Sequence, residues 1–130
     1  MILLDSHVAA WLALEPERIS AGAHVAINQA RASGEALAIC DITMLELAVL
    51  AKKGRIHLQT SLEAFLHGVE SRFRVLPITA KACACAAGLP ASYPNDPADR
   101  IIGATAIVEG LSLVTADQAI KASGALRTIW

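Results

Sequence analysis

Short apolar runs alternate with helix-like stretches along the whole chain, and this alternation limits the possible folds more than any other feature. Five runs have the length of β-strands: residues 2–4, 37–40, 74–78, 112–115 and 127–129. Six stretches have helical periodicity: residues 8–14, 20–33, 43–53, 61–71, 80–88 and 97–109. The strands are continuously apolar, which is typical of parallel strands buried on both faces. We therefore predict an α/β fold, a three-layer α/β/α sandwich with a short parallel sheet.

The length and composition favour one domain that associates with other chains. A chain of 130 residues has a common single-domain size, and we expect residues 1–130 to form one domain. Hydrophobic residues make up 55% of the sequence and charged residues only 18%, which leaves spare apolar surface. Since such surface is usually covered by a partner, we expect an oligomer.

The charge balance excludes a broadly basic nucleic-acid binder. The formal net charge is −1, so any contact with a nucleic acid has to be local. The one dense basic run is Lys52-Lys53-Gly54-Arg55, which is also typical of a solvated helix end.

Neither the cysteines nor the apolar runs indicate a zinc site or a membrane span. Cys40, Cys83 and Cys85 contain no C-x-x-C pair and have no histidine at zinc-ligand spacing, so we interpret them as small buried hydrophobic residues. No apolar run approaches the ~20 residues of a membrane helix, and Met1 leads directly into the first strand. We expect a cytoplasmic protein.

Two aspartates follow predicted strands. Asp5 comes after the first strand and Asp117 after the fourth. The carboxyl ends of parallel strands meet at one edge of the sheet, where open α/β sheets bind their ligands. Each aspartate taken alone is also a good helix N-cap.

A glutamate near the start of the third helical stretch has two interpretations. Thr43 and Glu46 match a capping box, in which Thr43 caps the helix and Glu46 reaches back to its amide. However, Ile42, Val49 and Leu50 lie one helical turn away from Glu46, which favours an inward-facing carboxylate. A buried charge of this kind needs a counter-charge or a metal.

A further acidic pair opens the last long helix, in Asp96-Pro97-Ala98-Asp99. Asp96 suits the N-cap position, with Pro97 as the first helical residue. Asp99 has small or apolar neighbours in Ile102, Gly103 and Ala106, so we predict that its carboxylate points inward.

Together the acidic residues indicate a metal site. Carboxylates gathered in one crevice repel one another, and a bound cation removes that penalty. A site made only of oxygen ligands suits Mg²⁺ or Mn²⁺. Such a cation activates water and stabilises the leaving oxygen of a phosphodiester, so phosphodiester hydrolysis is the expected chemistry. The predicted ligands are Asp5, Glu46, Asp99 and Asp117.

The same residues resemble a known family, the PIN domain, in the branch of VapC-type toxins from toxin–antitoxin pairs. The resemblance spans the chain and rests on four motifs: Leu3-Leu4-Asp5-Ser6-His7, Ile42-Thr43-Met44-Leu45-Glu46-Leu47-Ala48, Asp96-Pro97-Ala98-Asp99-Arg100-Ile101-Ile102-Gly103-Ala104-Thr105-Ala106, and Leu113-Val114-Thr115-Ala116-Asp117. It implies an endoribonuclease that forms a homodimer and is held inactive by a cognate antitoxin, whose tail fills the active-site groove.

The resemblance also implies residue roles. It makes Asp5, Glu46, Asp99 and Asp117 the ligands of Mg²⁺ or Mn²⁺. Supporting hydroxyls come from Thr115 and from Ser6, where the family more often has Thr.

We expect the other polar residues in and beside these motifs to have structural roles and not to ligate the metal. Asp41 stands where the family more often has a small residue, and we expect it to be solvated or to cap a helix. Arg100 could steer a phosphate, but a surface position or a salt bridge to Asp96 is favoured. We expect His7 to pack at the start of a helix.

Four alternatives are weighed against the nuclease. A receiver domain needs paired acids after the first strand and a late lysine, and a haloacid-dehalogenase-type phosphatase needs a second aspartate where His7 stands. Neither pattern is present. A PIN-like binding module that has lost catalysis, and a metal-independent ribonuclease that uses His7, remain as alternatives.

Overall fold

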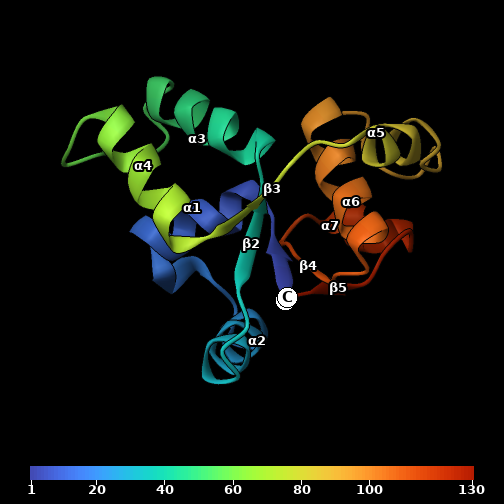
Figure 1. The fold of residues 1–130 in the computed structure, drawn as a ribbon, viewed down its shortest axis with the longest axis horizontal. Helices are drawn as coiled ribbons and strands as arrows, with labels where there is room; N and C mark the ends of the chain where they lie inside the picture. The colour runs from blue at the N-terminus through green and yellow to red at the C-terminus, as the bar shows by residue number, and fades with distance from the viewer.

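A five-stranded, all-parallel sheet forms the centre of the protein, which the computed structural model describes over residues 1–130 (Figure 1). The strand order is β3-β2-β1-β4-β5. The strands are β1 (Ile2–Leu4), β2 (Leu37–Cys40), β3 (Arg74–Leu76), β4 (Leu113–Val114) and β5 (Thr128–Ile129). The helices are α1 (Ser6–Leu14), the 3₁₀ helix η1 (Pro16–Arg18), α2 (Ala21–Ala32), α3 (Ile42–Lys52), α4 (Leu62–Arg72), α5 (Ala80–Ala87), α6 (Pro97–Glu109) and α7 (Gln118–Ser123).

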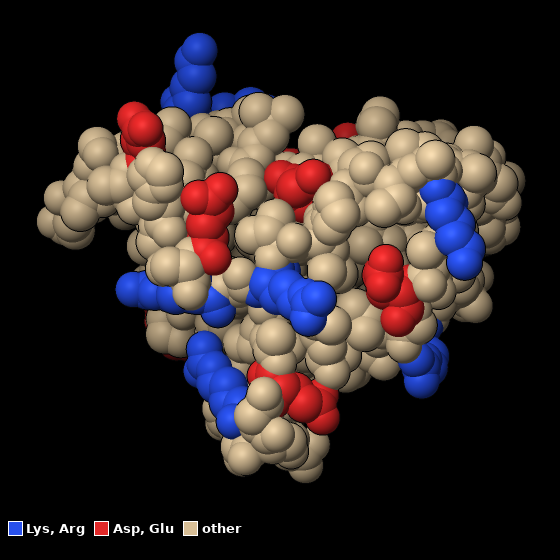
Figure 2. Space-filling model, in the orientation of Figure 1, with Lys and Arg blue, Asp and Glu red and all other residues tan.

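Helices cover both faces of the sheet, so the predicted three-layer α/β/α sandwich is confirmed. Figure 1 shows α1, α3 and α4 on one side of the strands, α5 to α7 on the other, and α2 below the strands. Buried residues of α2 belong to the same core cluster as those of α1, so α2 covers the same face as α1. None of the helices is both long and apolar enough to cross a lipid bilayer. On the face drawn in Figure 2, the lysine and arginine side chains form separate groups and no continuous basic surface, as the near-neutral net charge leads one to expect.

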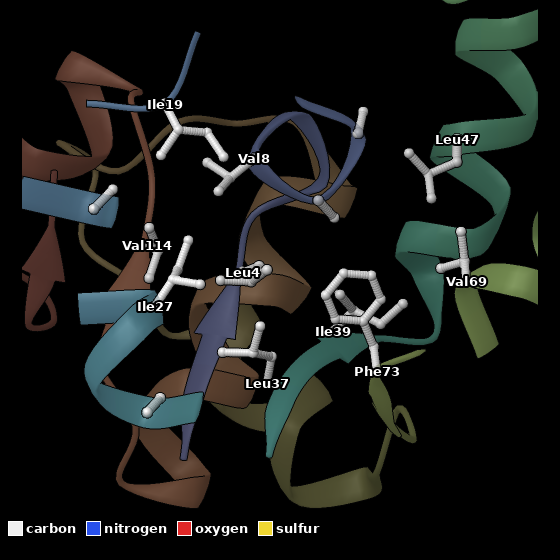
Figure 3. Packing of buried hydrophobic residues seen from close by; sticks show 14 residues of the cluster. Leu4, Val8, Ile19, Ile27, Leu37, Ile39, Leu47, Val69, Phe73 and Val114 are labelled. Carbon is white, nitrogen blue, oxygen red and sulfur yellow. The ribbon is translucent and has the colours of Figure 1, made fainter. Parts of the chain in front are cut away.

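Alternating strand residues supply two separate cores. Leu4, Ile39 and Val114 point toward α1 to α4 and belong to a cluster of 14 buried residues, drawn in Figure 3. Their neighbours Leu3 and Cys40 point the opposite way, into the cluster beneath α6 and α7. This double burial explains the continuous apolarity of the strands.

Tyr93 and Gly103 bring α6 close to the sheet. The Tyr93 ring is 1% exposed, and its hydroxyl donates to the backbone oxygen of Asp99 at 3.0 Å. A Cβ on Gly103 would lie 2.1 Å from the Tyr93 hydroxyl oxygen, so only glycine leaves room for the ring. The first turn of α6 is thereby fixed relative to the strands.

Several boundaries and one cysteine differ from the sequence expectations. The strand predicted at 74–78 ends earlier, as Arg74–Leu76. The strand predicted at 112–115 is one residue shorter at each end, as Leu113–Val114. Helices η1 and α7 were not predicted, because three and six residues are too few to display helical periodicity. The interpretation of all three cysteines as buried holds only for Cys40, since on α5 Cys83 is exposed and Cys85 is half-buried.

Candidate active site

The candidate site lies at the carboxyl ends of β1 and β4. The chain runs from β1 outward to β2 and β3 and then returns to place β4 on the other side of β1. This reversal of strand order opens a crevice at the strand ends, which is where open α/β sheets bind ligands. Asp5 directly follows β1, and its backbone amide donates to the Val114 oxygen at 3.0 Å, which holds the two strand ends together.

Asp5 is the most buried acid of the site, with 7% exposure. One carboxylate oxygen accepts a hydrogen bond from the Ser6 amide at 2.8 Å, and the other accepts one from the Thr115 hydroxyl at 2.7 Å. Burial raises the pKa of the Asp5 carboxyl, while the Thr115 and Ser6 hydrogen bonds oppose that rise. The residue therefore caps α1 and faces the crevice at the same time.

Asp117 is joined to Asp5 through one hydroxyl. The Thr115 hydroxyl donates to Asp5 and accepts from the Asp117 amide at 3.1 Å. The Asp117 carboxylate accepts from the Ile120 amide at 3.0 Å and so caps α7. Thr115 is fully buried, which fixes the relative positions of the two aspartates.

Glu46 reaches the crevice from the first half of α3. Its Oε1 accepts from the Ser6 hydroxyl at 2.6 Å, and Ser6 Oγ lies 2.9 Å from Thr43 Oγ1. The Ser6 hydroxyl has one proton, which it uses in the hydrogen bond to Glu46. In the contact between the two hydroxyls, Thr43 is therefore the donor and Ser6 the acceptor. Burial raises the pKa of Glu46, the Ser6 bond opposes this, and the charges of Asp5 and Asp96 add to the rise.

The capping-box interpretation of Thr43 and Glu46 is wrong. Helix α3 begins at Ile42, so Thr43 lies within its first turn and is fully buried. The supposed apolar stripe around Glu46 is also only partly correct, since Val49 is 39% exposed, whereas Ile42 and Leu50 are partly buried. Glu46 itself is half-buried.

Asp99 is an acid whose ionisation is strongly perturbed. Asp96 caps α6 by accepting from the Asp99 amide at 3.1 Å, and Pro97 is the first helical residue, as predicted. The Asp99 carboxylate accepts no hydrogen bond. Burial first, and then the charges of Asp5, Asp96, Glu46 and Asp117, raise its pKa from 3.8 to about 7.

Three of the four acids line one pocket of about 270 Å³. Asp5, Asp99 and Asp117 lie on its wall together with His7 and Trp11. Glu46 is not part of the wall and is connected to it through Ser6. No three acidic, histidine or cysteine side chains are arranged closely enough to ligate one ion together. The oxygen-only donors nevertheless suit a cation such as Mg²⁺, which keeps several of its waters and needs only one or two direct carboxylates.

The structure corrects two neighbouring interpretations and refines a third. Arg100 makes no salt bridge to Asp96; it is half-buried and donates to the carbonyls of Ala86 at 3.1 Å and Tyr93 at 3.5 Å. Asp41 makes no helix-capping bond with its side chain, which instead accepts from the amide of Ile78 at 3.3 Å.

His7 lies at the start of α1 as expected, but it is exposed. Its ring centroid is 6.0 Å from that of Trp11, and it lines the pocket beside the acids.

Sequence reasoning missed the buried hydroxyl of Thr43 and the ring of Trp11 at this site. Thr43 could have been found, because it lies three residues before Glu46 and therefore on the same helix face. Trp11 lies five residues after Ser6 on α1, and no spacing rule connects it to the acids.

Comparison with known proteins decides the family. The family model of the PIN domain matches residues 2–125. The chain belongs to the PIN-domain family. This PIN domain is 42% identical over 131 residues to the ribonuclease VapC22 of Mycobacterium tuberculosis, with 99% of this chain and 98% of that protein covered. It is therefore of the VapC type.

Solved structures agree with the PIN-domain fold. A chain of a toxin–antitoxin complex from Klebsiella pneumoniae is 26% identical, with a TM-score of 0.62, and the match covers 90% of this chain and 87% of that chain. A chain of VapBC2 from Rickettsia felis, crystallised with a promoter DNA fragment, has a TM-score of 0.71 at 19% identity, and the match covers 98% of this chain and 97% of that chain. The latter supports the fold alone.

Proposed function

We propose that this PIN domain is an endoribonuclease that depends on a divalent metal and acts as the toxin of a toxin–antitoxin pair. One observation carries the proposal. The Asp99 carboxylate has no hydrogen-bond donor, and it shares a pocket with Asp5 and Asp117, whose charges help to raise its pKa to about 7. A site that gathers negative charge without neutralising it is suited to a cation.

The proposed division of labour follows the contacts. One or two of Asp5, Asp99 and Asp117 would ligate Mg²⁺ or Mn²⁺ directly, and the other carboxylates of the site, Glu46 among them, would bind the waters that the cation keeps. When bound, the cation lowers the pKa of water and neutralises charge on the phosphate. Thr115 and Ser6 do not need to touch the substrate, because each donates a hydrogen bond that fixes a carboxylate.

The proposed partners are RNA, an antitoxin and a second copy of the chain. The similarity to a ribonuclease supports the first, and the similarity to a chain of a toxin–antitoxin complex supports the second. Exposed apolar side chains offer surface for protein partners, notably Leu45 and Val49 on α3, Leu62 on α4, and Ile78 after β3.

A catalytically silent PIN-like binding module is the second candidate. It is favoured by the absence of any three acidic, histidine or cysteine side chains close enough to ligate one ion together. The two proposals differ in what happens to RNA when metal is added.

The experiment is to incubate the purified protein with total RNA and Mg²⁺ or Mn²⁺, with and without EDTA, and to map the new RNA ends. We expect cleavage only when metal is available, and none by Asp99→Asn. Glu109→Gln is the matched control, because it removes an exposed carboxylate from the same helix and should leave cleavage unchanged. Cleavage in EDTA would favour histidine chemistry through His7, whereas intact RNA under every condition would favour the silent module.

A further inference from the structure

A second cavity, of about 140 Å³, adjoins the carboxylate pocket. It lies between α1, η1 and the end of α3, and His7 and Trp11 belong to the walls of both cavities. Leu50 and Ile56 contribute apolar surface, and Arg55 stands at its edge. A molecule seated in this cavity would therefore extend directly toward the acids.

The Trp11 ring is held in place on several sides. The Arg18 guanidinium lies over it, 4.6 Å from the ring centroid, and Glu15 holds Arg18 through an ion pair of 3.1 Å. Trp130 packs against it at a centroid distance of 5.9 Å and an interplanar angle of 53°. This support gives the cavity a preorganised aromatic wall.

Arg55 is a free cation at the same cavity. Helix α3 ends in a turn in which Gly54 adopts a φ of 71° and the Arg55 amide donates to the Leu50 oxygen at 2.9 Å. This turn directs the chain back toward α1. The Arg55 side chain is exposed, and its guanidinium makes no hydrogen bond or ion pair within the protein.

We propose that this cavity binds one single-ring base of the RNA, next to the phosphate that is cut, and that Arg55 contacts the adjoining phosphate. The inference rests on the proposed nuclease function. A buried cavity of about 150 Å³ accepts benzene, so about 140 Å³ suits a pyrimidine better than a purine. Aromatic walls beside a cation are the usual means of holding single-stranded nucleic acid. The near-neutral chain has no continuous basic surface on the face of Figure 2, so a local contact of this kind is needed.

Binding is measured apart from cleavage, by tryptophan fluorescence in EDTA. Trp130→Phe leaves Trp11 as the only tryptophan, because the chain has two. Short oligouridylate should quench Trp11 in a saturable way, with a dissociation constant at least about fivefold lower than that of oligoadenylate. Equal affinity for the two oligonucleotides, or binding without quenching, would overturn the inference.

The contribution of Arg55 is tested against a neighbouring lysine. In the same background Arg55→Ala should weaken oligouridylate binding at least about fivefold, since it removes a charged phosphate contact. Lys53→Ala removes the same charge from the same helix end but from a residue outside the cavity, and should change affinity less than about twofold. Equal losses in the two variants would indicate general electrostatics and would overturn the inference.

The result separates this inference from the proposed function. RNA cleavage by the wild type without quenching of Trp11 would remove the base subsite and leave the nuclease. Quenching and its dependence on Arg55, without any cleavage in metal, would establish the subsite on a module that binds RNA but does not cut it.

Discussion

Replacing Asp99 by asparagine should stabilise the metal-free protein while it removes activity. Most substitutions at partly buried positions destabilise a fold. Asp99 is different because burial and the neighbouring carboxylates disfavour its charge, and no hydrogen bond compensates. Asn has the same shape without the charge, so the penalty disappears in Asp99→Asn.

The size of the stability gain in Asp99→Asn follows from the raised pKa of Asp99. A rise from 3.8 to about 7 corresponds to about 4 kcal/mol against the ionised form if solvent screened none of it. Asp99 is partly exposed, so screening reduces the expected gain in unfolding free energy to about 1–2 kcal/mol. For a chain of this size that is a rise in Tm of roughly 3–8 °C.

The pH dependence has a definite sign. The folded protein holds the Asp99 proton more tightly than the unfolded chain, so this group stabilises the fold at acid pH. Its contribution falls as the pH rises from about 4 and reaches its minimum above about 7. The gain from Asp99→Asn should therefore be absent near pH 4 and complete at pH 7.5.

Denaturant unfolding in EDTA at a series of pH values measures this effect. Glu109→Gln serves as the control for loss of one negative charge on α6, and should change stability by less than about 0.5 kcal/mol. A loss of stability in Asp99→Asn at pH 7.5, or a gain that does not vary with pH, would refute the electrostatic account of the pocket.

Three further outcomes are expected. Thr115→Val should lower the free energy of unfolding by about 2–3 kcal/mol and shift the pH profile of cleavage to higher pH, because the Asp5 carboxylate loses a buried hydrogen-bond donor. Thr115→Ser keeps the hydroxyl and should restore the stability and the pH profile. Gly103→Ala should cost about 1–3 kcal/mol in chemical denaturation because the new methyl overlaps Tyr93, whereas Gly68→Ala, with open space around it, should gain up to about 1 kcal/mol. Mg²⁺ at ten times its dissociation constant should stabilise the wild type by about 1.4 kcal/mol in thermal unfolding, and an unchanged Tm would argue against a metal site.

The sheet could be predicted from the sequence because strands buried on both faces are continuously apolar. The bounds of β1 and β2 agree with the predicted runs 2–4 and 37–40, since every residue of these runs packs into a core. The later strands were predicted too long. Apolar residues such as Ile78 continue past the last ladder pair of β3, and hydrophobicity alone does not mark where strand pairing stops.

The candidate site was predictable in part. Strand ends and right-handed topology were enough to expect Asp5, Asp99 and Asp117 at one edge, and these three line one pocket. The path by which Glu46 reaches them was not predictable, because it depends on a contact between the hydroxyls of Ser6 on α1 and Thr43 on α3, which are 37 residues apart in sequence. Contacts of this kind depend on how α1 and α3 pack against each other, and the hydrophobic periodicity of the sequence does not predict that packing.

One titration decides whether these carboxylates bind a divalent cation and cut RNA. The rate of cleavage of a single defined RNA is measured against Mn²⁺ concentration for the wild type and for Asp99→Asn. We expect a saturable rise for the wild type that EDTA abolishes, and no cleavage by Asp99→Asn at any concentration. Cleavage by Asp99→Asn at the wild-type rate, or a wild-type rate that is independent of Mn²⁺ and persists in EDTA, would contradict this expectation.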